Sequence, residues 1–169
     1  MTPLHGLPGA GEVLAWRLDD ERFKAAWDSG EGAFQVGGRW NSPGVRAVYC
    51  AIDPATAVLE VAVHKTFSVL DTVPHVLTAL KILDPSSIHI VDPGAVPNPN
   101  WLRPGIPGAG QQAFGDVLLA AHMFVLIPSA VSVYSWNLVF EATKAKGAYS
   151  IERQERFALD TRLHPPIRP

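Results

Sequence analysis

The sequence predicts a single α/β (α+β) domain with a mixed, mostly antiparallel sheet. The chain has 169 residues, an ordinary length for one domain, and 47% of them are hydrophobic while 18% are charged. This composition allows a sizeable core. Apolar runs of strand length outnumber the helical segments, and the regular alternation of strand and helix that a doubly wound sheet needs is absent. Fifteen prolines and fourteen glycines favour short elements joined by turns.

The first elements follow from local composition. Residues 1–12 are rich in proline and glycine and predict a lead-in to a domain that covers residues 13–169. Residues 13–18 alternate between apolar and other side chains, as a strand does. One of the two aspartates that follow can cap a short helix that ends at Trp27. The glycines of residues 28–38 then predict a loop, because glycine leaves the backbone free to turn.

A hairpin and several further strands complete the predicted sheet. Residues 39–41 predict a short strand, Ser42-Pro43-Gly44 a tight turn and residues 45–51 the returning strand. The long segment 93–110 is rich in proline and glycine, and a loop of this length inside a domain is usually functional. The other expected elements are strands over 73–83, 87–91, 123–127, 131–134, 138–142 and 156–163, and a helix over 111–122.

The hairpin is followed by a helix with a clear beginning. Asp53 is a good N-cap and Pro54 suits the first helical position, so the helix begins there and runs to about Lys65. Apolar side chains occupy nearly all of its faces, which predicts a largely buried helix.

Glu60 is the one carboxylate within this apolar run. A buried and unpaired carboxylate costs several kcal/mol, so Glu60 must be paired, protonated or placed at the wall of a cavity. A structural ion pair with Arg39 or Arg17 and a functional role are about equally consistent with the pattern, since both arrangements perturb a carboxylate.

Three other residues could carry chemistry. Arg39 follows two glycines, where the backbone can approach a ligand closely, and its guanidinium can fork onto phosphate or carboxylate oxygens. Tyr49 stands near the end of an apolar strand, and Ser129 follows another strand in a place that can present a hydroxyl. Each also has an ordinary explanation as an exposed arginine, a half-buried strand aromatic or a turn serine.

Composition and motifs exclude several function classes. The formal net charge of −2 and a pI near 6.3 give no bulk attraction to nucleic acid or to an anionic membrane. One cysteine, Cys50, cannot form an internal disulfide, and no histidine or cysteine spacing suits a metal, so we expect no metal site. No apolar run approaches the ~20 residues of a membrane span, and the N-terminal residues lack the basic-then-apolar pattern of a signal peptide, so we expect a cytoplasmic protein.

The chain resembles the RES domain family, which is named for its arginine, glutamate and serine. The resemblance is carried by the motif Gly-Gly-Arg-Trp-Asn-Ser-Pro-Gly at residues 37–44, a strand with a tyrosine near its end, and the helical segment Leu-Glu-Val-Ala-Val-His. It extends over most of the chain, from Trp16-Arg17-Leu18 through Ile127-Pro128-Ser129 and Asn137-Leu138 to residues 157–163.

The resemblance implies a fold similar to that of the ADP-ribosyltransferase toxins and NAD+ as the substrate. It also implies that the chain is the toxin of a bacterial toxin–antitoxin pair, with an Xre-like antitoxin as its partner. The glutamate would stabilise an oxocarbenium-like centre, and the arginines would hold the pyrophosphate. Matched onto this sequence, the catalytic residues are Glu60, Arg39 and Tyr49, and the NAD+-binding residues are Arg17, Arg39, Trp40, Tyr49, Glu60 and Ser129.

The residues leave open both the acceptor of ADP-ribose and the class of function. The ADP-ribose acceptor could be water, phosphate or a host protein, so the reaction is either NAD+ degradation or mono-ADP-ribosylation. The antitoxin is expected to neutralise the toxin by covering the NAD+ site. A different class of function is a catalytically silent binding module, in which Arg39 and Glu60 form a structural ion pair.

Overall fold

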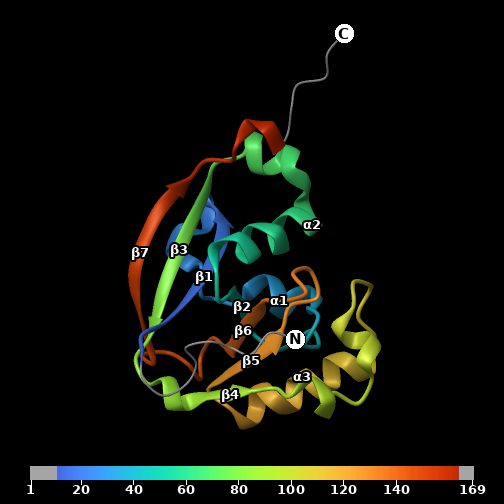
Figure 1. Cartoon of the computed structure of the whole chain (residues 1–169). Coiled ribbons are helices and arrows are strands. Elements are labelled where there is room, and N and C mark those ends of the chain that lie inside the picture. The colour runs from blue at the N-terminus through green and yellow to red at the C-terminus, as the bar shows by residue number, and fades with distance from the viewer. Residues whose placement is uncertain (1–10, 164–169) are drawn as a thin grey trace.

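Within residues 11–163, which the computed structural model describes, seven strands form one open sheet (Figure 1). The parallel neighbours β4 and β5 lie at one edge, and the other neighbouring strands run antiparallel, which confirms the predicted fold class. Most of the expected lead-in, residues 1–10, lies outside the described residues. In spatial order the strands are β4 (Ile88–Ile90), β5 (Phe124–Pro128), β6 (Trp136–Glu141), β2 (Ala47–Ala51), β1 (Val13–Asp20), β3 (His75–Ile82) and β7 (Tyr149–Phe157).

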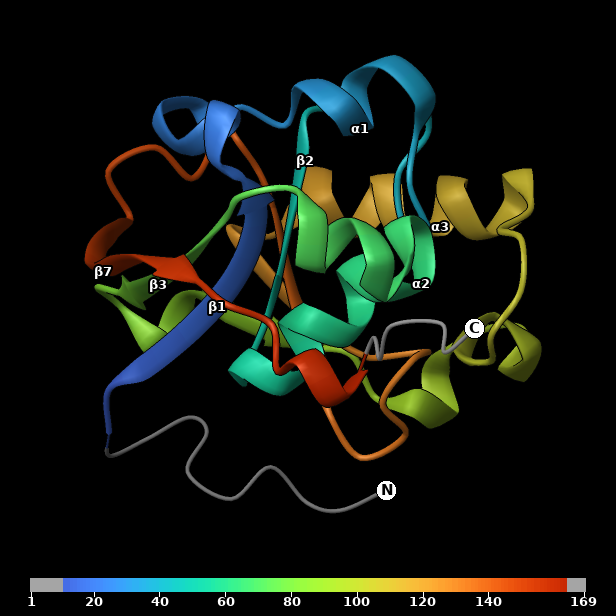
Figure 2. The same ribbon diagram turned by 90° about the horizontal axis from the view of Figure 1, so that it is seen from above.

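The helices pack on different parts of this sheet. Helix α2 (Pro54–Thr72) contacts β1 and β2, whereas α3 (Ala109–Ala121) contacts β5 and β6. The short α1 (Glu31–Val36) lies beside β2 (Figure 2). Short 3-10 turns fill the connections: η1 (Glu21–Ala26), η2 (Pro85–Ser87), η3 (Pro93–Ala95), η4 (Pro99–Leu102) and η5 (Thr161–Leu163).

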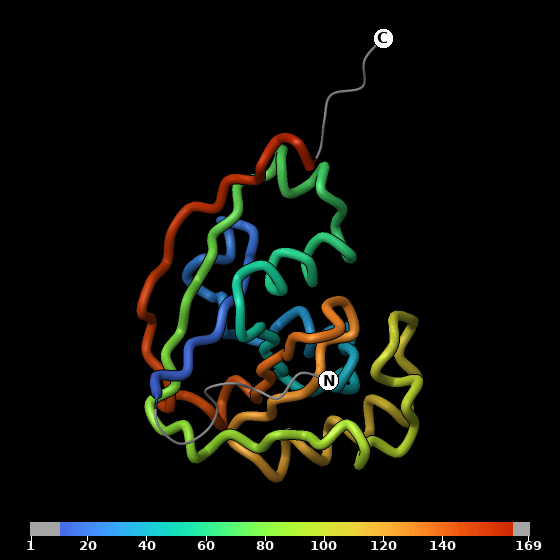
Figure 3. The backbone as a smooth tube through the Cα atoms, in the orientation of Figure 1, coloured from blue at the N-terminus to red at the C-terminus, as the bar shows by residue number. Residues whose placement is uncertain are grey.

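The sheet is weakly joined between β1 and β2. A single residue pair, Trp16 and Ala51, is in register there among the described residues, whereas β1 pairs with β3 along its whole length. Strands β1, β3 and β7 turn away from the other four, as the trace in Figure 3 shows. Because α2 contacts both strands at this junction, the helix lies where the two parts of the sheet separate.

Alternate residues of the central strands enter two hydrophobic clusters. Leu138 and Phe140 of β6 belong to a cluster with residues of β1 and β3, whereas Val139 between them belongs to a cluster covered by α3. Tyr49 of β2 packs against this second cluster. Because side chains two positions apart share one face of a strand, Asn137 points to the same face as Val139.

Helix α2 begins as predicted but is more exposed than its sequence suggests. Asp53 caps it and Pro54 is its first residue. Near the expected end, Thr66 adopts a φ of 69°, a strained conformation for a β-branched residue, and the helix then resumes. Leu59 and Val63 are 37% and 59% exposed. The prediction of a largely buried helix is therefore wrong.

Four other local predictions are corrected by the structure. The segment expected as a loop over 28–38 contains α1; Gly30 caps its N-terminus and Gly37 its C-terminus, both at positive φ, so these glycines bound the helix rather than prevent it. Residues 39–41 form a turn with an isolated bridge, and residues 131–134 form bends and turns, so neither is a strand. The strand expected over 156–163 lies earlier, as β7. Charged side chains on this exposed edge strand hide the usual apolar pattern.

Candidate functional site

The first turns of α2 are tied to the connection between β5 and β6. The Asp53 carboxylate caps the helix by accepting from the Thr56 backbone N–H at 2.7 Å, and it also accepts from the Ser135 hydroxyl at 2.5 Å. Partial burial opposes ionisation, but these hydrogen bonds outweigh it and lower the pKa of Asp53. The loop that carries Ser135 lies beneath α2 in Figure 3. These contacts set the position of the helix relative to the sheet.

Glu60 lies two turns further along α2, where its carboxylate meets Ser129, which follows β5, and Asn137 of β6. Its Oε1 accepts from the Ser129 hydroxyl at 2.8 Å and from the Asn137 Nδ2 at 2.7 Å. Its Oε2 has no hydrogen-bond partner among the described residues. The carboxylate is thus anchored through one oxygen, and the other oxygen can accept hydrogen bonds from a bound molecule.

Ser129 is oriented by its own backbone turn. The hydroxyl oxygen accepts from the N–H groups of Val131 and Ser132, both at 3.1 Å, and the residue is only 3% exposed. A hydroxyl has one proton to donate. With two N–H groups on its oxygen, Ser129 directs that proton to Glu60.

Asn137 is a site residue that the sequence analysis did not select. It pairs in register with Ala51 of β2 and with Ile127 of β5, which places it near the start of a central strand. The residue is 6% exposed, and its Oδ1 is buried without a hydrogen-bond partner among the described residues. An unsatisfied buried polar atom costs about 1–3 kcal/mol. The family resemblance includes Asn137-Leu138 but gives the asparagine no role, because its partner Glu60 is distant in sequence.

Tyr49 holds the turn that precedes its own strand. Its hydroxyl accepts from the Trp40 backbone N–H at 2.9 Å and donates to the Asn41 Oδ1 at 2.7 Å. Burial raises the pKa of Tyr49, and the charge of Glu60 adds to this rise while that of Arg39 opposes it. The tyrosine therefore lies within electrostatic reach of both Glu60 and Arg39.

The Arg39 guanidinium is bound to the long loop between β4 and α3. It donates to the carbonyl oxygens of Trp101 at 3.3 Å, Arg103 at 3.2 Å and Gly105 at 2.8 Å. No ion pair joins Arg39 to Glu60 within residues 11–163. The structural ion pair that the binding-module alternative requires is therefore wrong.

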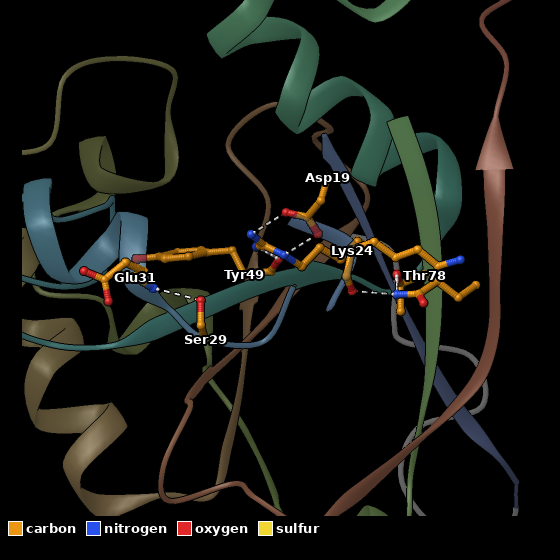
Figure 4. Close-up of polar contacts among 8 residues, drawn as sticks. Asp19, Lys24, Ser29, Glu31, Tyr49 and Thr78 are labelled. Carbon is orange, nitrogen blue, oxygen red and sulfur yellow. Dashed lines mark hydrogen bonds and ion pairs between the residues drawn. The ribbon is translucent and has the colours of Figure 1, made fainter. Parts of the chain in front are cut away.

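Arg17 is bound within the sheet by Asp19 and the Tyr49 backbone. Figure 4 shows where Asp19 and Tyr49 lie relative to each other. Its Nε and Nη2 donate to the two carboxylate oxygens of Asp19 at 2.9 and 2.8 Å, and its Nη1 donates to the Tyr49 carbonyl at 2.9 Å. A fork of this kind is the strong form of an arginine–carboxylate pair. An ion pair between Arg17 and Glu60 is therefore also wrong.

The structure does not place the Trp40 side chain where a ligand could reach it. The residue is 2% exposed, and its indole packs edge-on against Phe114 of α3. Gly115 lies so close to the Trp40 backbone that a Cβ at that position would overlap the carbonyl. We therefore treat Trp40 as support for its neighbour Arg39.

The described residues offer neither a metal-binding cluster nor a membrane-spanning helix. Residues 11–163 contain no group of three or more His, Cys, Asp or Glu side chains that could hold a metal ion. Over the same residues, no helix combines the length and the hydropathy required to cross a membrane.

Comparisons with known proteins agree with the resemblance noted in the sequence. The RES domain family matches residues 14–162. A protein named Toxin Res from Photorhabdus laumondii is 31% identical over 156 residues, which cover 89% of this chain and 97% of that protein. Another Toxin Res, from Pseudomonas putida, is 29% identical and covers 89% of this chain and 99% of its own. A protein from a Sphingobium species named Prs ADP-ribosylating toxin is 36% identical over 130 residues, or 73% of this chain and 79% of its own.

A solved structure shares the fold. The chain matches the crystal structure of the MbcT-MbcA toxin–antitoxin complex of M. tuberculosis with a TM-score of 0.68 and 22% identity. The match covers 88% of this chain and 85% of the other.

Proposed function

Because the chain belongs to the RES domain family of toxins, we propose that it binds NAD+ and cleaves the bond between nicotinamide and ribose. The Glu60 carboxylate carries this proposal, since Oε1 is anchored by Ser129 and Asn137 while Oε2 has no partner among the described residues. The name of the Sphingobium relative, which includes ADP-ribosylation, supports NAD+ as the substrate.

The chemistry requires stabilisation of positive charge. As the bond between ribose C1′ and the nicotinamide nitrogen breaks, its electron pair leaves with nicotinamide, and the ribose becomes oxocarbenium-like. Oε2 of Glu60 would accept hydrogen bonds from the ribose hydroxyls and stabilise that charge. An acceptor then attacks C1′ and loses a proton, which completes hydrolysis, phosphorolysis or transfer to a protein.

The other residues would bind and orient the dinucleotide. Arg39 suits the pyrophosphate, in which case phosphate oxygens would replace the three loop carbonyls that it binds here. Tyr49 would place its ring near the nicotinamide, and Ser129 would contribute mainly through Glu60. Arg17 and Trp40 would act indirectly, because Asp19 and the core hold them.

The test follows both products of adenylate-labelled NAD+. Antitoxin-free protein is incubated with labelled NAD+ and a bacterial lysate, and free nicotinamide and labelled protein bands are measured. Nicotinamide release with unlabelled proteins indicates NAD+ degradation, and a single labelled band with little bulk NAD+ loss indicates transfer to one target.

We expect Glu60→Gln to lower the rate of nicotinamide release by about 100-fold or more. Glu155→Gln makes the same change at an exposed position on β7 and should leave the rate unchanged. An inactive wild-type protein would refute the proposal.

We also infer a cytoplasmic antitoxin partner of the Xre type that covers the NAD+ site and prevents growth arrest in the producing cell. The fold match to the toxin chain of a toxin–antitoxin complex supports such a partner. NAD+ binding is measured by calorimetry for the toxin alone and for the complex. Equal affinity in both would refute the covering of the site.

A further inference from the structure

We propose that Asn137 is a positioning residue for NAD+ cleavage: with Ser129 it fixes Oε1 of Glu60 and thereby directs Oε2 toward the substrate. The inference rests on the proposed function of Glu60. The two contacts of 2.7 and 2.8 Å reach the same carboxylate oxygen from β6 and from the residue that follows the adjacent strand β5. Two donors on one oxygen restrict rotation of the carboxylate about its terminal torsion, which a single donor would leave freer.

The orientation of the Asn137 amide follows from its partner. An ionised carboxylate only accepts hydrogen bonds, so the amide must present its NH2 group to Glu60. Its carbonyl oxygen is then turned away and stays buried without a partner among the described residues. An asparagine that served only the fold would be expected to use both ends of its amide. Here the residue satisfies Glu60 and leaves its own acceptor unsatisfied.

The surroundings of Asn137 leave it little freedom. It lies in register between β2 and β5 and is 6% exposed. The contact with Glu60 spans 77 residues of sequence. Among the ionisable residues near this contact, Tyr49 lies within electrostatic reach of Glu60, and Asp53 is two turns earlier on α2. No cation among the described residues pairs with Glu60, so the two neutral donors are its anchors.

Asn137→Asp separates a positioning role from a purely structural one. The variant keeps the shape of the side chain but replaces the donor with a second carboxylate beside Glu60. As the pH falls, two neighbouring carboxylates take up one proton between them, and the protonated one can then donate to the other. We expect kcat at pH 8 to fall about 100-fold with KM changed less than about threefold, and activity to recover as the pH is lowered toward 5. Wild type should show no such recovery.

Asn137→Ala removes the donor without adding a charge. It should lose a similar share of kcat and show no recovery at low pH. Asn100→Asp makes the same amide-to-carboxylate change at an exposed position and should keep the wild-type pH profile. Thermal melting establishes that each variant is folded at each pH.

The outcomes separate the two proposals. If wild type releases no nicotinamide, the proposed function fails, whatever Asn137 does. If wild type is active and both Asn137 variants keep its kcat, the positioning role is refuted. A loss of kcat in both folded variants without recovery of Asn137→Asp at low pH would show that a donor to Glu60 is not what position 137 supplies, and it would also overturn the positioning role.

Discussion

The guanidinium of Arg17 donates to the backbone carbonyl of Tyr49 across the junction of β1 and β2, at 2.9 Å. One residue pair is in register at this junction, so the arginine supplies a link between strands that ladder hydrogen bonds supply elsewhere. The same guanidinium is fixed by both oxygens of Asp19. The candidate site is therefore held together by a side chain at the point where the sheet is weakest.

Arg17→Lys should destabilise the protein by about 1.5–3 kcal/mol, because an ammonium cannot fork onto Asp19 and reach the Tyr49 carbonyl at once. Urea unfolding measures the change. Arg22→Lys is the matched control, since Arg22 pairs with Asp20 but is largely exposed, and it should change stability by less than about 0.5 kcal/mol. Equal effects of the two substitutions would contradict the bridging role.

Tyr49→Phe should cost about 1–3 kcal/mol, because it leaves the Trp40 N–H and the Asn41 Oδ1 without their shared hydroxyl partner. The turn that holds Arg39 would loosen, so KM for NAD+ should rise. Chemical unfolding and steady-state kinetics measure the two effects. Tyr134→Phe removes a hydroxyl from a side chain that is 72% exposed and should leave both quantities unchanged. A Tyr49→Phe protein with wild-type stability would show that this hydroxyl does not hold the turn.

Gly38→Ala should lower both stability and NAD+ cleavage. A Cβ at this position would lie 2.6 Å from the Asn41 Oδ1 and 2.7 Å from the Tyr49 hydroxyl, so the turn before Arg39 would have to shift. Gly32→Ala in α1 is the control, because a Cβ there meets nothing within 4 Å. That substitution should stabilise the protein by about 0.5–1 kcal/mol. Thermal melting of both variants measures these changes. An unchanged melting temperature for Gly38→Ala would contradict the predicted shift of the turn.

Ser135→Ala should destabilise the protein by about 1–2 kcal/mol at neutral pH, through loss of the hydrogen bond to Asp53. Because the folded-state pKa of Asp53 lies below its ordinary value of 3.8, ionised Asp53 contributes stability above that value, and the contribution disappears as the pH falls through the lower folded-state pKa. The difference between wild type and Ser135→Ala should therefore shrink below pH 4. Urea unfolding from pH 7 to pH 2.5 measures it, and a difference independent of pH would refute the link.

Local patterns predicted much of the fold because capping and turn residues act over a few positions. Asp53 and Pro54 mark the start of α2, and the strand at residues 45–51 and the helix at 111–122 match β2 and α3 closely. The edge strand β7 escaped prediction, because its outer side chains face solvent and carry charges in place of apolar residues. Helix α1 was also missed, because the glycines at its two ends suggested a loop.

The sequence by itself determined the fold class, the strand that carries Tyr49, the helix that carries Glu60, and the family resemblance, because these depend on spacing within short segments. Only the tertiary structure decided which side chains meet. It brought Glu60 into contact with Asn137, 77 residues away in sequence. It also paired Arg17 with Asp19 and the Tyr49 carbonyl, and it buried Trp40 against α3. Such pairings depend on strand order and register, and these are set by the packing of the whole sheet, which no local pattern contains.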